Sequence, residues 1–112
     1  FKLAIVECPS SLSDLKTTVK GTQNTDLLTG VSNSKTTASG GADYAAVTIA
    51  RASAPDAPFT INSTNDAQRL VWSAAEITSK EIPLVATLKE TQTGKMTTGD
   101  FEAIVTFEFS YE

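Results

Sequence analysis

The residue types that most often carry out chemistry in proteins are scarce in this sequence. Its 112 residues include no histidine and one cysteine, Cys8. Histidine is the commonest general base near neutral pH and the commonest zinc ligand, so its absence removes many enzyme and metal sites. The aspartates stand singly in turn-like segments, without the spacing of a calcium-binding loop. We therefore predict that the protein is not an enzyme and has no metal site and no cofactor.

Two short patterns look like parts of active sites, but their spacing is wrong. Residues 94–97, Gly-Lys-Met-Thr, look like the end of a phosphate-binding loop, yet the position five before Gly94 is Lys89 rather than glycine. Glu102 and Glu108 share one face of an expected strand, but six extended residues separate them by roughly 20 Å, too far for a glycosidase pair. A hairpin turn and two solvent-facing charges are the simpler interpretations.

Two candidate carbohydrate features also have simpler explanations. Asn62-Ser63-Thr64 matches a glycosylation acceptor, a tripeptide that often occurs by chance. Trp72 could stack on a sugar, as in a lectin. Its neighbours Leu70 and Val71 instead favour packing in the core or at its rim.

Charge and hydropathy exclude two classes of partner. The sequence has 13 acidic and 9 basic residues, for a net charge of -4. A nucleic-acid-binding protein would need a basic surface, so no nucleic acid is expected. No apolar run approaches the roughly 18 residues that cross a bilayer, so no direct membrane insertion is expected. Cys8 is either a buried thiol or the partner of a cysteine on a segment outside this sequence.

Alternation of apolar and polar residues with a period of two dominates the chain and predicts strands. Strands are expected over residues 1–6, 15–20, 44–50, 59–61, 69–72, 82–88 and 101–111. A short edge strand could form near Leu27, Leu28 and Val31, and residues 33–41 have the composition of an exposed loop. One helical turn over residues 73–80 is a less favoured interpretation. Short strands at this spacing predict a single all-β sandwich domain over residues 1–112.

The last expected strand has the most informative pattern. Its alternate positions form an apolar, aromatic-rich row, while the positions between them are mostly polar. The row consists of Phe101, Ala103, Val105, Phe107, Phe109 and Tyr111. It follows a turn signal at Gly99-Asp100 and continues to the penultimate residue. One interpretation is a terminal strand packed on the opposite sheet, with Gly99 an ordinary hairpin glycine.

Residues 99–112 resemble the C-terminal signature of chaperone–usher pilus subunits, the fimbrial pilins. That signature has a glycine fourteenth from the end, here Gly99, and a penultimate tyrosine, here Tyr111, with alternating apolar residues between them. Residues 1–9 resemble the pilin strand that ends in the family's second cysteine, and residues 15–21 resemble the strand that follows. The resemblance touches both ends of the chain, while the middle is generic.

The resemblance implies an incomplete immunoglobulin-like β-sandwich, completed by a donor strand from another chain or segment. The donor would lie in a groove beside the apolar row of residues 101–111. A periplasmic chaperone would fill the groove first and hold the carboxylate of Glu112 with basic residues. After passage through an usher, the extension of a neighbouring pilus subunit would replace the chaperone strand.

Further expectations follow from the same resemblance. The upstream donor extension and first strand of a pilin are not matched here, so the domain is expected to be truncated at its N-terminus. Cys8 would then form a disulfide with a cysteine in that missing segment. The protein would reach an extracellular pilus through the periplasm of a Gram-negative bacterium. The alternatives are the pilin-like anchoring domain of a tip adhesin and an unrelated extracellular β-sandwich that binds carbohydrate.

Overall fold

A computed structural model describes residues 1–4 and 15–111 of the chain. The described residues form seven strands and two short helices. The strands are β1 (Lys2–Ala4), β2 (Leu15–Lys20), β3 (Gly30–Ser32), β4 (Ala45–Arg51), β5 (Leu70–Val71), β6 (Glu81–Glu90) and β7 (Thr106–Tyr111). The helices are the 3-10 helix η1 (Thr37–Ser39) and α1 (Ala74–Ser79). This composition confirms the predicted all-β class.

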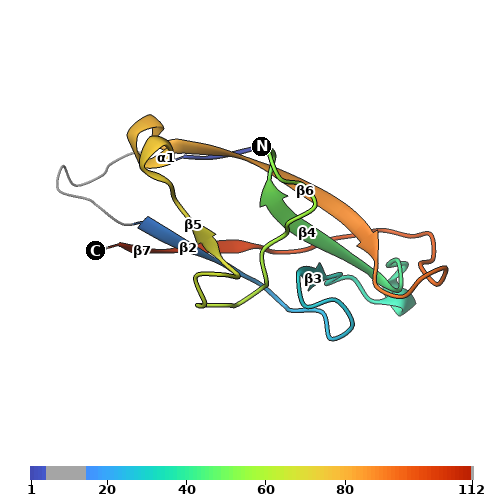
Figure 1. Ribbon diagram of the computed structural model, residues 1–112. Coiled ribbons are helices and arrows are strands. Elements are labelled where there is room, and N and C mark those ends of the chain that lie inside the picture. The colour runs from blue at the N-terminus through green and yellow to red at the C-terminus, as the bar shows by residue number, and fades with distance from the viewer. Residues whose placement is uncertain (5–14, 112) are drawn as a thin grey trace.

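The strands form two sheets that pack into a sandwich. One sheet has the order β1-β6-β4-β3 and the other the order β5-β2-β7, and the strand pairs within each sheet are antiparallel. Figure 1 shows β4 and β6 running together in one layer and β2 beside β7 in the other. The molecule is elongated along the strands, with extents of 50 × 22 × 21 Å.

The core lies between the inner faces of the two sheets, where alternate residues of each strand point. Its largest fully buried side chains come from both layers and from the β4–β5 connection: Ile61, Leu70, Ile82, Leu84, Val19 and Val31. Trp72 is also buried, and its indole Nε1 donates a hydrogen bond to Thr17 Oγ1 at 2.9 Å. The packing interpretation of Trp72 is therefore confirmed, and a lectin-like role for its ring is wrong.

One strand prediction in the middle of the chain was wrong. Residues 59–61 are not a strand, because their amides donate to three different segments: Phe59 to Ile49, Thr60 to Gln68 and Ile61 to Leu28. Phe59 and Ile61 are nevertheless buried. In β4, Ala45 and Ile49 are buried, and Val47 is half-buried against the same core.

The less favoured helical turn at residues 73–80 is present as α1. A reciprocal capping box stabilises its first turn: Ser73 Oγ accepts from the Glu76 amide, and the Glu76 carboxylate accepts from the Ser73 amide. The Glu76 carboxylate also accepts two bonds of 3.1 Å from the Arg51 guanidinium at the end of β4. These contacts fix a six-residue helix that hydrophobic periodicity alone does not reveal.

The final strand is shorter than the predicted residues 101–111, because β7 begins at Thr106. Its partner β2 ends at Lys20, and the next residue, Gly21, is held by Asn62 instead. Gly21 N–H donates to Asn62 Oδ1 at 3.1 Å, and Asn62 Nδ2 donates to Gly21 O at 2.9 Å. The ladder therefore stops at the Lys20–Thr106 pair. The Asn62 amide is occupied by this contact, so it is a structural residue.

Candidate functional site

The strand β7 lies at the edge of its sheet, so its second side has no strand partner among the described residues. The segment before it, residues 101–105, lies outside any described strand. No hydrogen bond joins the backbone of Phe101, Ala103 or Val105 to another described residue. An edge with free N–H and C=O groups is a template for pairing with another strand.

The apolar row of residues 101–109 lies along this edge and is incompletely covered. Phe101, Ala103, Val105 and Phe107 are half-buried, and Phe109 is exposed over 37% of its surface. The Phe109 ring lies 6.2 Å from the Trp72 ring, measured between centroids. Ala103, Val105 and Phe107 pack against the core and Phe109 lies beside Trp72, so this part of the predicted row faces inward, as expected for one face of a strand.

Phe107 connects this row to the edge of the other sheet. Its ring lies 6.4 Å from the ring of Phe1, beside β1, and Phe1 is 60% exposed. Aromatic rings at this separation and tilt attract one another. The two sheets thus meet at their open edges through a pair of aromatic side chains that are both in contact with solvent.

The opposing sheet is also uncovered at one end. The inward residues of β6 are Ile82, Leu84, Ala86 and Leu88, as the sequence pattern predicts. Ile82 and Leu84 are buried, whereas Ala86 is exposed and Leu88 is 51% exposed. β1 pairs only with the first part of β6, up to Pro83, with Phe1 adding a bond to Leu84. The inner face of β6 beyond that point lacks the cover that a further strand would give.

The remaining predicted site residues are placed as follows. Tyr111 is the last residue of β7, and its backbone pairs with Leu15. Cys8 and Glu112 lie outside the described residues, as do the expected end of the first strand and the disulfide. Gly99 precedes the edge segment with a φ of +152°, and it packs against the backbone of residues 40–42. Sequence reasoning did not identify Leu88 as uncovered or Asn33 as a contact of the edge segment.

Charged side chains line the outer face of the edge. Lys20 Nζ lies 3.4 Å from Glu108 Oε2, so Glu108 is a solvent-facing charge with a cross-strand partner, as predicted. Nearby, Lys16 of β2 and Arg69, which directly precedes β5, both contact Asp66, and their hydrogen bonds hold the pKa of Asp66 below its ordinary value. These exposed pairs contribute little stability. They keep the outer surface polar while the inner row stays apolar.

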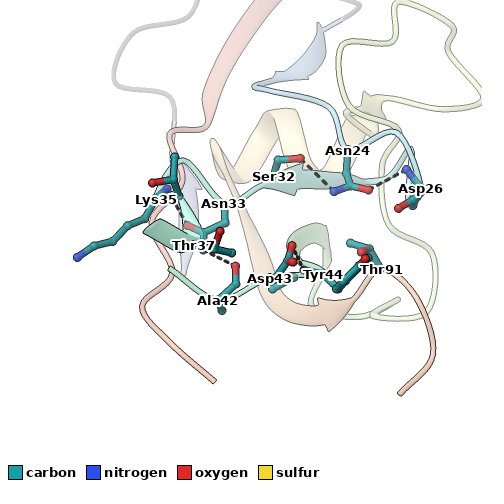
Figure 2. Close-up of a pocket in the computed structure, with 12 residues that line it drawn as sticks. Asn24, Asp26, Ser32, Asn33, Lys35, Thr37, Ala42, Asp43, Tyr44 and Thr91 are labelled. Carbon is teal, nitrogen blue, oxygen red and sulfur yellow. Dashed lines mark hydrogen bonds between the residues drawn. The ribbon is translucent and has the colours of Figure 1, made fainter. Parts of the chain in front are cut away.

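A separate polar cleft of about 350 Å³ lies near the loop ends of β3, β4 and β6. Figure 2 shows that many of its polar groups bond to one another: Asn24 to Ser32 and to the Asp26 amide, and Asp43 to the Tyr44 amide. The ammonium group of Lys35 points away from the cleft in Figure 2 and pairs with Asp100 at 2.9 Å. These bonds stabilise the loops, and they account for much of the polar lining without a ligand.

The described residues show neither a metal centre nor a membrane span. No group of three or more metal-ligating side chains occurs among residues 1–4 and 15–111. No helix in this part of the chain is long and apolar enough to cross a bilayer. The arrangement offers hydrogen-bonding backbone and apolar surface, which are the means of polypeptide recognition.

Comparison with known proteins agrees with this description. No curated protein matches the sequence. A family model described as "Fimbrial protein" matches residues 1–112, the whole chain. That family consists of structural proteins of extracellular pili, whose members associate with other pilus subunits. The chain therefore belongs to the fimbrial protein family and is a pilin, a structural subunit of a pilus.

Proposed function

We propose that this pilin accepts a strand from another polypeptide along the open edge formed by residues 101–111. The observation that carries the proposal is the combination of two features on one edge. The backbone of residues 101–105 lacks strand partners among the described residues, and the inward apolar row beside it is half-exposed. A strand added here would complete the backbone bonds and cover the row at the same time.

The incoming strand would place alternate side chains against both walls of a groove. One wall is the row that includes Val105 and Phe107, and the other is the uncovered end of β6 at Ala86 and Leu88. Each well-buried aliphatic side chain contributes roughly 1.5–3 kcal/mol. Four or five of them give on the order of 10 kcal/mol before ordering costs, which is comparable to the stability of a whole small domain.

The donors belong to a chaperone–usher assembly pathway in this proposal. A periplasmic chaperone strand occupies the edge first and binds the carboxylate of Glu112, and an usher then exchanges it for the extension of a neighbouring subunit. In the same proposal, Cys8 pairs with a cysteine that lies outside residues 1–112. The C-terminal signature from Gly99 to Tyr111 supports this assignment.

The test compares the intact subunit alone with the same subunit fused, through a flexible linker, to a strand of alternating valine and threonine. We expect the fusion to raise the urea midpoint of unfolding strongly. A control fusion, with every valine replaced by serine, keeps the backbone donors but lacks the apolar side chains. Equal midpoints for the subunit alone and the valine fusion would contradict the proposal.

A further inference from the structure

The side chain of Asn33, in the loop after β3, bonds to the segment that leads into the open edge. Asn33 Nδ2 donates to Asp100 O at 2.9 Å and to Ala42 O at 3.0 Å. Its Oδ1 accepts from the Glu102 amide and from the Lys35 amide, each at 3.0 Å. One amide group therefore makes the four bonds of which it is capable, and two of them reach the edge segment.

The Ser34 side chain and backbone groups of the same loop extend this contact. The Ser34 amide donates to Glu102 O at 2.7 Å, and Ser34 Oγ donates to the same oxygen at 3.0 Å. Asp100 N–H donates to Gly40 O at 2.9 Å, and Asp100 O accepts from the Ala42 amide at 2.8 Å. Gly41 and Asp100 form a parallel β-bridge, so the two backbones lie as close together as neighbouring strands of a sheet.

Gly99 allows the two segments to approach this closely. A Cβ built on Gly99 would lie 2.7 Å from Ala42 N, 2.8 Å from Gly40 O and 2.9 Å from Gly41 C. These neighbours are backbone atoms that cannot rotate away. Any other residue at position 99 would separate the loop from the edge segment, and its φ of +152° also disfavours a side chain.

The contact determines which way the edge segment presents its backbone. Both the N–H and the C=O of Glu102 bond to the loop at Asn33 and Ser34. Consecutive residues of an extended chain direct these groups to opposite sides. The corresponding groups of Phe101 and Ala103 are therefore directed away from the loop, and no described residue bonds to them.

We propose that Asn33, Ser34 and the backbone of residues 40–42 form a loop clamp that fixes the register of residues 101–105, so that this segment is ready to pair with an incoming strand. The proposal rests on the strand-accepting function proposed above. It makes Asn33 a positioning residue that acts on the donor strand through Glu102. Without the clamp, no backbone hydrogen bond to a described residue holds residues 101–105 extended, and only β7 would offer an ordered edge.

The experiment measures dissociation of synthetic strand peptides from the intact subunit. The long peptide has twelve residues of alternating valine and threonine with a lysine at each end. Two shorter peptides each lack four residues, one from either end. In the unsubstituted subunit, we expect both shorter peptides to dissociate about tenfold or more faster than the long one, because each loses backbone bonds and apolar side chains.

In Asn33→Ala, one of the two shortened peptides should dissociate at a rate within about twofold of the long peptide. The other shortened peptide should still dissociate about tenfold or more faster than the long one. That asymmetry identifies the end of the peptide that lies on residues 101–105. If the substitution only destabilised the subunit in general, both shortened peptides would still dissociate faster than the long peptide by similar factors. Asn24→Ala is the matched control, because Asn24 bonds to Asp26, Leu27 and Ser32 in the neighbouring loop and to nothing in residues 99–102.

The outcomes are distinct. If both truncations keep their full effect in Asn33→Ala, the loop clamp is wrong. If Asn33→Ala does not fold, Asn33→Asp replaces it, since this variant keeps the Oδ1 acceptor for Glu102 and loses the two donated bonds; it should reduce the effect of one truncation, and an unchanged pattern would overturn the proposal. If the long peptide does not bind the unsubstituted subunit at all, the strand-accepting function itself fails.

Discussion

The two ends of β6 have the same sequence pattern and very different surroundings. At its beginning, Ile82 and Leu84 are 1% and 2% exposed, whereas Leu88 near its end is 51% exposed. The change also occurs across the sheet, because Val31, Val47 and Leu88 form one cross-strand row whose members are buried, half-buried and exposed in that order. Alternation therefore reports which residues face the interior, but it does not report whether the interior is covered.

The largest expected effect separates these two ends of β6 directly. Ile82→Ala should lower the free energy of unfolding by about 2–5 kcal/mol whether or not a donor strand is fused to the subunit, because its site is already closed. Leu88→Ala should cost less than about 1 kcal/mol without the donor and clearly more with it. Urea unfolding of the two variants and of the unsubstituted subunit, each with and without the donor strand, measures these costs. An equal cost for Leu88→Ala in both states would break the comparison.

A second substitution tests the boundary between the closed and open regions. Gly99→Ala should lower the free energy of unfolding by about 2 kcal/mol or more, because its Cβ meets backbone atoms of residues 40–42 at a strained φ. Gly94→Ala is the matched control: its φ is also positive, at +75°, but nothing lies within 4 Å of its Cβ. Both are measured in the donor fusion by urea unfolding. Equal costs would show that only backbone strain, and not the close approach, matters at Gly99.

A third substitution concerns Asn62, which holds Gly21 at the point where the ladder between β2 and β7 stops. Asn62→Ala removes two hydrogen bonds to Gly21 and should cost about 1–2 kcal/mol. The Gly21 amide should also exchange with solvent faster, which NMR can measure residue by residue. Asn65→Ala serves as the control, since Asn65 Oδ1 accepts one local bond from Ala67. Unchanged exchange at Gly21 would contradict the role assigned to Asn62.

The smallest expected effect is a pH dependence of stability that comes from Glu76, in α1. Burial raises the pKa of Glu76, but hydrogen bonds from Arg51 and from the Ser73 amide outweigh it, so the pKa lies below its ordinary 4.5. A lowered folded-state pKa means that Glu76 adds stability above about pH 4.5, and that this contribution disappears as the pH falls through the lowered value.

Glu76→Gln should therefore reduce stability at pH 7 by less than about 1 kcal/mol and weaken its loss toward pH 3. Urea midpoints at the two pH values measure the difference. Glu81→Gln is the control, because Glu81 is exposed and its carboxylate forms an exposed ion pair with Lys2 at 3.5 Å. A pH dependence unchanged by Glu76→Gln would place the responsible group elsewhere.

Local sequence patterns predicted much of the fold because strand alternation is a local property. The strands β2, β4 and β6 lie close to where their alternating residues place them. The helix α1 is too short for periodicity, although the capping box of Ser73 and Glu76 was a readable signal for it. The turn at residues 91–95 was likewise predictable from its composition.

The contacts that shape the open edge could not be predicted, because they join residues far apart in the sequence. Nothing near Asn62 indicates that it holds Gly21 and so ends β2 before residues 101–105 can pair with it. Asn33 looks like an ordinary loop residue, yet its partners Asp100 and Glu102 lie nearly seventy positions away. The apolar row of the last strand was readable in full, while the reason for its incomplete pairing was not.

The way in which the loop after β3 is attached has a consequence for its exterior. Its bonds to residues 99–102 come mainly from backbone groups, Asn33 and Ser34, with Lys35 adding an ion pair to Asp100. The side chains of η1, residues 37–39, are exposed and make no bond to that segment. The outward face of this loop is thus free to accept new residue types, and a substitution or an inserted label at residues 37–39 should leave the bonds to residues 99–102 in place.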